Sequence, residues 1–232
     1  MNAKNTVITF LNDHDNALLD FTRDLVATPS PMPPGNERAV AERIQGEFNR
    51  LRLGAAQVIA AKPDRPNLLL KLDGGQPGPT LIFNGHTDTK PAGNRDEWKH
   101  DPLDPVVENG KLYGLGSTDM KSGVAAMIYA TAAVAQVSEQ LAGQLHLLLV
   151  ADEEGGSQLG AKFLAAEGHI SGDAILIGEP AGIRRELESI ALDSRGICCF
   201  RIRVHGDQMH SSLSDEFNAT NASVKAAGLI TR

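Results

Sequence analysis

Apolar residues recur along this chain with two different periods. Residues 13–27 and 37–53 have the spacing of amphipathic helices, and the alanine-rich segment 119–137 predicts a helix buried on most sides. The shorter predicted elements are strands at 57–61, 67–72, 80–84, 144–150 and 174–177, a helix at 157–167 and a hairpin that turns at Asn109-Gly110. Strands alternate with helices in this pattern, which predicts an α/β fold with a largely parallel, mixed sheet flanked by helices.

The pattern changes in the last quarter of the chain. Segments 186–193 and 196–204 show the strong alternation of half-exposed strands, and residues 218–232 predict a helix. We therefore expect a catalytic α/β domain over residues 1–190 and the beginning of a small α+β lid domain over residues 191–232. The last helix has no glycine cap or other stop signal, so we expect the sequence to be a piece of a longer protein.

Bulk properties narrow the classes of partner. The net charge of −7, with no compensating basic run, argues against a nucleic-acid surface. No apolar stretch approaches the roughly 20 residues of a membrane span, and the first residues lack the basic and apolar regions of a signal peptide. The only cysteines, Cys198 and Cys199, are adjacent, and strand neighbours point to opposite faces, so we expect no structural disulfide. Together these features predict a cytoplasmic protein that binds neither nucleic acid nor membrane.

Acidic residues and one histidine follow the predicted strands. His86 and Asp88 follow residues 80–84, and a glycine-containing turn delivers Asp119 to the start of the long predicted helix. The other acidic residues after strand ends are Glu153, Glu154 and Glu179. Open α/β sheets place their ligands at the carboxyl ends of the strands, so we expect these side chains to converge. A mixed set of His, Asp and Glu suits divalent zinc, manganese or cobalt.

Each of these residues also has a plainer interpretation. Asp119 could merely complement the dipole of the helix that it opens. Glu153 and Glu154 could be a solvated acidic pair; alternatively, their diverging side chains could divide the work, one binding metal and the other facing a water. A dinucleotide loop at Gly114-x-Gly116 is rejected, because the third glycine is missing and Asp119 would repel a pyrophosphate. Converging carboxylates would repel one another unless cations were bound, which favours the metal site.

Four ordered motifs carry a family resemblance. They are Gly85-His86-Thr87-Asp88-Thr89, Tyr113-Gly114-x-Gly116-x-x-Asp119-Met120-Lys121, Asp152-Glu153-Glu154-Gly155 and Gly178-Glu179-Pro180. Together they resemble the co-catalytic di-zinc amidohydrolase and exopeptidase family, which includes acetylornithine deacetylase, succinyl-diaminopimelate desuccinylase, aminoacylase and glutamate carboxypeptidase. The resemblance covers essentially the whole chain. It implies a zinc-exopeptidase-like fold and two divalent metal ions, most simply Zn²⁺, with Co²⁺ or Mn²⁺ as alternatives.

The resemblance also implies roles for individual residues. His86 and Glu179 would bind one metal and Glu154 the other, with Asp119 bridging both. Glu153 would act as the general base, and Asp88 would assist it through His86. The peptide bond between Asp119 and Met120 would be cis. These roles describe the hydrolysis of an amide bond in N-acyl amino acids or small peptides.

The resemblance further implies a lid domain used for dimerisation, hence a homodimer. His210, in the motif Gly206-Asp207-Gln208-Met209-His210-Ser211-Ser212, would reach an active site to bind substrate or the oxyanion. The length of the chain departs from the family, whose members supply a last histidine ligand after the lid. His205 is the nearest candidate here, and we expect it to be structural. The alternative hypothesis is therefore a truncated, non-catalytic relative that binds metal or a partner chain without turnover.

Overall fold

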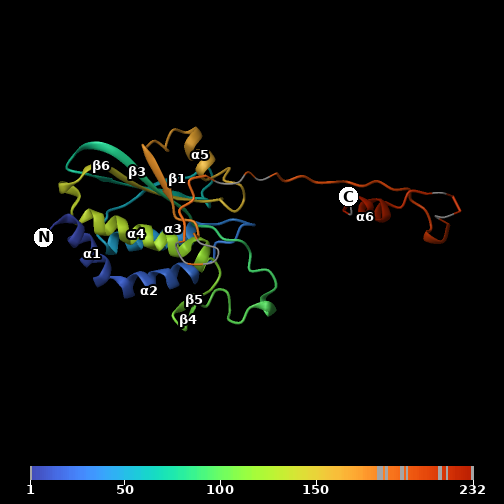
Figure 1. Cartoon of the computed structure of the whole chain (residues 1–232), viewed down its shortest axis with the longest axis horizontal. Coiled ribbons are helices and arrows are strands. Elements are labelled where there is room, and N and C mark those ends of the chain that lie inside the picture. The colour runs from blue at the N-terminus through green and yellow to red at the C-terminus, as the bar shows by residue number, and fades with distance from the viewer. Residues whose placement is uncertain are drawn as a thin grey trace. The chain divides into compact units, whose positions relative to one another are not determined.

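The chain divides into two compact units, Met1–Glu188 and Ser189–Arg232. The structure is a computed structural model, and it describes residues 2–181, 185, 188–193, 196, 198–213, 216–217 and 219–230. The first unit holds nearly all of the regular structure and every predicted metal ligand, and Figure 1 shows its helices and sheet.

A five-stranded sheet forms the centre of the first unit. In spatial order its strands are β1 (Gln57–Ile59), β2 (Asn67–Asp73), β6 (Ala142–Val150), β3 (Gln76–His86) and β7 (Ala174–Ile177). Strand β3 is parallel to both of its neighbours, β6 and β7, whereas β2 is antiparallel to β1 and β6. The predicted α/β fold with a mixed sheet is confirmed. The parallel trio brings three strand ends to one edge.

Helices cover both faces of this sheet (Figure 1). Those on one face are α1 (Ala3–Asp13), α2 (Asp15–Val26), α3 (Arg38–Arg50) and α4 (Ser122–Ala135), and α5 (Ala161–Ala166) covers the other. Leu68 and Leu70 of β2 join the larger core under the helices, while Leu69 between them packs with Leu164 of α5. Successive strand residues point to opposite faces, so one leucine run fills both cores. Among the described residues, none of the helices combines the length and apolar character needed to cross a membrane.

The helix boundaries differ from the prediction in three places. Helix α1 was not predicted, because none of its residues is fully buried and its apolar stripe is weak. The predicted helix 119–137 begins only at Ser122, since Asp119 has extended rather than helical backbone angles (φ −120°, ψ 100°). The predicted helix 157–167 begins only at Ala161, because Ser157 has a positive φ of 63°. The last two displaced starts both lie in the loops that carry acidic residues.

The hairpin prediction is confirmed. Strands β4 (Val106–Glu108) and β5 (Lys111–Tyr113) pair in antiparallel register around Asn109 and Gly110. Both turn residues have positive φ angles, 53° and 75°, as the tight mirror-image turn of a two-residue hairpin requires. The hairpin leads directly into the glycine-containing turn before Asp119.

The prediction for the second unit is wrong in its strands. The described residues of segments 186–193 and 196–204 contain no strand. Alternating apolar residues form a strand only where a neighbouring strand shares their backbone hydrogen bonds, and the described part of this unit offers none. The predicted helix is present as α6 (Ala222–Ile230), where the Asn221 side chain caps the first turn by accepting hydrogen bonds from the Ser223 and Val224 amides.

A buried carboxylate links α3 to α4 and makes stability depend on pH. Tyr129 donates a hydrogen bond to Glu47 at 2.7 Å, and Arg50 donates two more at 2.6 and 2.8 Å. Burial disfavours the charged form, but these hydrogen bonds outweigh it and lower the pKa of Glu47 below its ordinary 4.5. A lowered pKa contributes stability that is fully present above the unfolded-state value and is lost as the pH falls through the folded-state value.

We therefore predict that Glu47→Gln destabilises the protein at neutral pH and that this difference shrinks in acid. The difference between the free energies of unfolding of the two proteins should begin to shrink as the pH falls below the ordinary glutamate value of 4.5. Urea unfolding at a series of pH values measures it. Glu42→Gln, on the exposed side of the same helix, is the control. A difference that stays constant down to pH 3 would contradict the prediction.

Candidate metal centre

The ends of three adjacent parallel strands form the centre. His86 is the last residue of β3 and lies in register with Val150, the last residue of β6. On the other side of β3, Asn84 lies in register with Ile177, the last residue of β7. The loop carrying Glu153 and Glu154 and the loop carrying Glu179 therefore both start beside His86. The expected convergence at the carboxyl edge of the sheet is observed.

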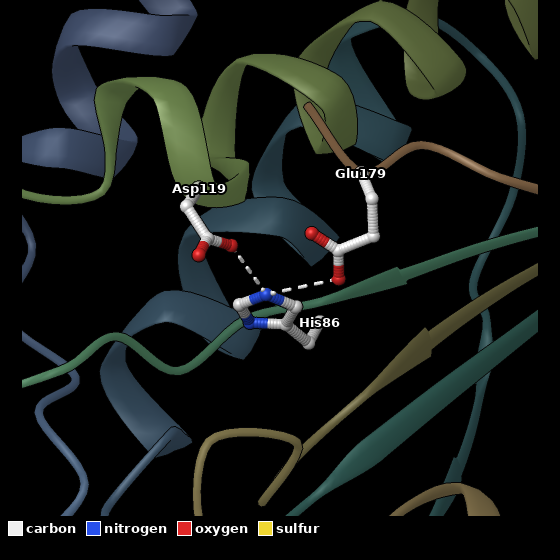
Figure 2. A group of neighbouring side chains, drawn as sticks. All are labelled: His86, Asp119 and Glu179. Carbon is white, nitrogen blue, oxygen red and sulfur yellow. Dashed lines mark hydrogen bonds and ion pairs between the residues drawn. The ribbon is translucent and has the colours of Figure 1, made fainter. Parts of the chain in front are cut away.

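His86 lies at the middle of this convergence and is almost fully buried. Its Nδ1 lies 2.9 Å from the backbone carbonyl of Asp88, so Nδ1 carries the proton and Nε2 faces the carboxylates. Nε2 lies 2.9 Å from Asp119 Oδ1 and 3.5 Å from Glu179 Oε1, as Figure 2 shows. These three side chains bring ligand atoms within 4.8 Å of one another.

The turn before α4 aims the carboxylate of Asp119. Gly116 has a φ of 77°, and its missing side chain leaves room for Thr89, whose Cγ2 would lie only 2.6 Å from an added Cβ. The Asp119–Met120 peptide bond is cis, as expected. Lys121 then anchors the turn, because its buried Nζ donates hydrogen bonds to the carbonyls of Leu25 and Thr28 at the end of α2. Burial lowers the pKa of Lys121 to about 7.

Glu153 and Glu154 differ in exposure and in their partners. The Glu153 side chain is 45% exposed and its Oε2 lies 4.0 Å from His86 Nε2. The Glu154 side chain is only 10% exposed, and Lys90 donates a hydrogen bond to its carboxylate at 2.8 Å. His86, Glu153 and Glu154 form a second group whose ligand atoms lie within 4.8 Å of one another.

Asp88 is connected differently from what the sequence suggested. Its contact with His86 is made mainly by the backbone carbonyl, while the carboxylate oxygen lies 3.5 Å away. The fully buried carboxylate instead accepts the backbone amides of Glu153 and Glu154, each at 3.1 Å. One residue therefore fixes both the orientation of the imidazole and the backbone of the acidic pair.

A buried ion network behind the acidic loop was not predicted from the sequence. Arg65 donates two hydrogen bonds to Glu37, at 2.6 and 2.8 Å, and a third to Asp152 at 3.2 Å. All three side chains are nearly inaccessible to solvent. Asp152 has a positive φ of 63°, an uncommon backbone conformation for aspartate, and Arg65 holds its side chain in place. The unusual run of three acids at 152–154 was the only signal in the sequence.

The electrostatics of the centre fit a divalent cation. Burial raises the pKa of Glu179 to about 7, and the charges of Asp119 and Glu153 add to the rise against that of His86. Burial also raises the pKa of Glu153. For His86, burial alone would lower the pKa, but the hydrogen bond and charge of Asp88, with Glu179 and Asp119, raise it to about 9. The carboxylates thus draw a positive charge to Nε2, where a cation can replace the proton.

His210 lies in the second unit. Its Nδ1 is 2.7 Å from the hydroxyl of Ser212 in the same segment, and both side chains are exposed. Its expected contact with substrate remains a prediction.

Comparison with known proteins identifies the chain at family level. The model of Peptidase family M20/M25/M40 matches residues 82–223, which is more than half of the chain. The chain belongs to this peptidase family. This chain is 36% identical to a succinyl-diaminopimelate desuccinylase from Halorhodospira halophila over 202 residues, which are 84% of this chain and 51% of that protein. The enzyme of the same name from Stenotrophomonas maltophilia is 33% identical over 203 residues, with the same two shares. The chain spans about half the length of the curated relatives it matches.

Solved structures have the same fold, among them one from the M20 family. A metallo-carboxypeptidase from Sulfolobus solfataricus aligns with a TM-score of 0.61 and 22% identity, over 72% of this chain and 38% of that chain. Human carnosine dipeptidase 1 aligns with a TM-score of 0.60 and 26% identity, over 75% of this chain and 40% of that chain. The family resemblance drawn from the four motifs is therefore confirmed.

The position of Asp88 yields a prediction about stability. Asn in place of Asp88 keeps the shape but presents an amide NH₂ to one of the two backbone N–H groups, which loses its acceptor. We expect Asp88→Asn to lower the free energy of unfolding of chelator-stripped protein by about 1–3 kcal/mol. Asp73→Asn, on the exposed end of β2, is the matched control. An unchanged or higher stability would mean that relief of carboxylate repulsion outweighs the lost hydrogen bond.

Proposed function

We propose that this protein is a metal-dependent hydrolase that cleaves the amide bond of N-acyl amino acids or small peptides. One observation carries the proposal: two groups of metal-ligating atoms share His86, one with Asp119 and Glu179 and the other with Glu153 and Glu154. A pair of metal sites suits hydrolysis, in which attacking and leaving groups both need stabilising. Membership of a metallopeptidase family supports the same chemistry.

The proposed division of labour follows the family resemblance. His86 and Glu179 would hold one divalent ion, Glu154 would hold the other, and the half-exposed Asp119 carboxylate would be shared between them. Zinc suits this donor set best, with cobalt or manganese as substitutes. Such ions would polarise the scissile carbonyl and lower the pKa of the attacking water.

Glu153 is the proposed general base. Its carboxylate is half exposed, lies at the mouth of the centre and has a pKa raised toward the range in which a base both accepts and returns a proton. It takes the proton from water and passes it to the leaving amine. Asp88 positions the Glu153 backbone through its amide, and Arg65 supports the preceding Asp152.

The relatives suggest the substrate class. The similar desuccinylases are named for an N-succinylated amino acid, and human carnosine dipeptidase 1 for a dipeptide. We therefore propose N-succinyl-diaminopimelate, other N-acyl amino acids and dipeptides as the first compounds to assay. His210 is the proposed substrate-binding residue of the lid, and a homodimer through the lid is the proposed assembly.

Metal binding is the first test. Zinc at about 100 times its dissociation constant should add about 2.7 kcal/mol to the free energy of unfolding. For a chain of this size, that raises the melting temperature of chelator-stripped protein by about 5–10 °C. His86→Ala should remove the part of the shift that comes from the His86 site, and His169→Ala, outside the centre, should retain the whole shift. An unchanged melting temperature in the wild-type protein would contradict the proposal.

The adjacent glutamates give the second test. Glu153→Gln keeps its shape but cannot accept a proton, so turnover should fall by about 10²-fold or more while zinc affinity stays near that of the wild type. Glu154→Gln should lose affinity for one zinc as well as activity. Hydrolysis of the proposed substrates and zinc titration measure the two effects. Equal loss of zinc in both variants would contradict the assignment, and two bound zinc ions without turnover would favour the non-catalytic alternative.

A further inference from the structure

Lys90 forms an ion pair with Glu154, a proposed metal ligand of the centre. Lys90 Nζ lies 2.8 Å from Glu154 Oε2 and donates a second hydrogen bond to the Glu154 backbone carbonyl at 2.7 Å. The lysine is 62% exposed, whereas the glutamate side chain is 10% exposed. The ammonium group of Lys90 is therefore bound to both the side chain and the backbone of Glu154.

The backbone on both sides of this contact is fixed. Thr89, just before Lys90, is buried and exchanges backbone hydrogen bonds with Ser30 and Met32. Glu154 receives its own support from Asp88, whose carboxylate accepts the Glu154 amide. The contact between Lys90 and Glu154 thus joins two rigid backbone segments. Only the flexible side chain of Lys90 has to move for this contact to break.

The other carboxylates of the centre have a different cationic neighbour. Asp119, Glu153 and Glu179 all pair with His86, at 2.9, 4.0 and 3.5 Å. Glu154 pairs with Lys90. Glu154 therefore differs from the other carboxylates: a cation at Asp119 and Glu179 replaces a proton on the imidazole, whereas a cation at Glu154 meets an ammonium that is already bound.

We propose that Lys90 competes with the divalent cation for Glu154, so that it selectively weakens the metal site to which Glu154 belongs. This inference rests on the proposed function. A cation bound to Oε2 at the usual distance of about 2.1 Å would lie within about 5 Å of an ammonium that kept its present contact. The two positive charges repel, so metal binding requires Lys90 to swing into solvent.

The expected effect is moderate, because the lysine is exposed and screened by solvent. Exposed ion pairs change an equilibrium constant by up to about fivefold. Lys90→Met keeps the apolar stem and removes the charge, so it should tighten the second zinc constant by about fivefold and leave the first within about twofold. Lys90→Arg retains the charge and should behave like the wild type.

The experiment is a zinc titration of the chelator-stripped 232-residue chain against a competing fluorescent chelator. Lys99→Met is the matched control, since Lys99 is also an exposed lysine paired with a glutamate, Glu108, outside the centre. A second measurement follows acetylation of Lys90 by mass spectrometry, with and without zinc. Zinc should speed acetylation of Lys90 and leave that of Lys99 unchanged.

The outcomes separate this inference from the proposed function. An unchanged or weakened second constant in Lys90→Met would overturn it, and so would equal tightening of both constants. A single zinc in every variant would also overturn it, while leaving metal binding itself intact. Failure of every variant to bind zinc would remove the proposed function and this inference together.

Discussion

The carboxylate of Asp88 is the contact on which the arrangement of the centre depends. It is fully buried, accepts the amides of Glu153 and Glu154, and belongs to the residue whose carbonyl orients His86. A buried charge is costly unless hydrogen bonds satisfy it. Two backbone amides and the neighbouring imidazole meet that requirement, and in doing so they tie the end of β3 to the loop after β6. The parallel register brings His86 close to the loop after β6, and the hydrogen bonds of Asp88 then fix the positions of His86, Glu153 and Glu154.

A second set of buried charges, Arg65 with Glu37 and Asp152, also supports the acidic loop. Arg65 lies between two carboxylates, so its positive charge is balanced where solvent cannot reach it. Asn67, also fully buried, accepts the amide of Ala151 and donates to the Leu159 carbonyl. The acidic loop is therefore held by side chains from the start of β2 as well as by Asp88. Such support makes the acidic loop rigid enough to keep its geometry when the charge of the centre changes.

Sequence reasoning reached the fold and the proposed ligands because both rest on local signals. Strand β6 and helix α4 have strong apolar patterns, and each proposed ligand lies at the end of a strand or in the loop or turn that follows one. The apolar pattern gave a wrong helix boundary at Asp119. Its helical period includes Asp119 in the helix, whereas the backbone there is extended and α4 begins at Ser122. The pattern also could not predict the role of Arg65. Its partner Asp152 is 87 residues away, and residue spacing along the chain does not indicate so distant a contact. The strands expected after residue 186 show a further limit, since alternation cannot say whether a partner strand is present.

The acidic centre is balanced by three kinds of positive charge that differ in mobility. Arg65 is buried between two acids and is a permanent part of the frame. His86 carries a proton that a cation at Nε2 can replace without any movement of the ring, because the Asp88 carbonyl already fixes it. Lys90 lies at the surface on a flexible stem and can leave. Cations can therefore enter the carboxylate cluster by exchange with a proton and an ammonium, while the buried frame keeps the ligands in place.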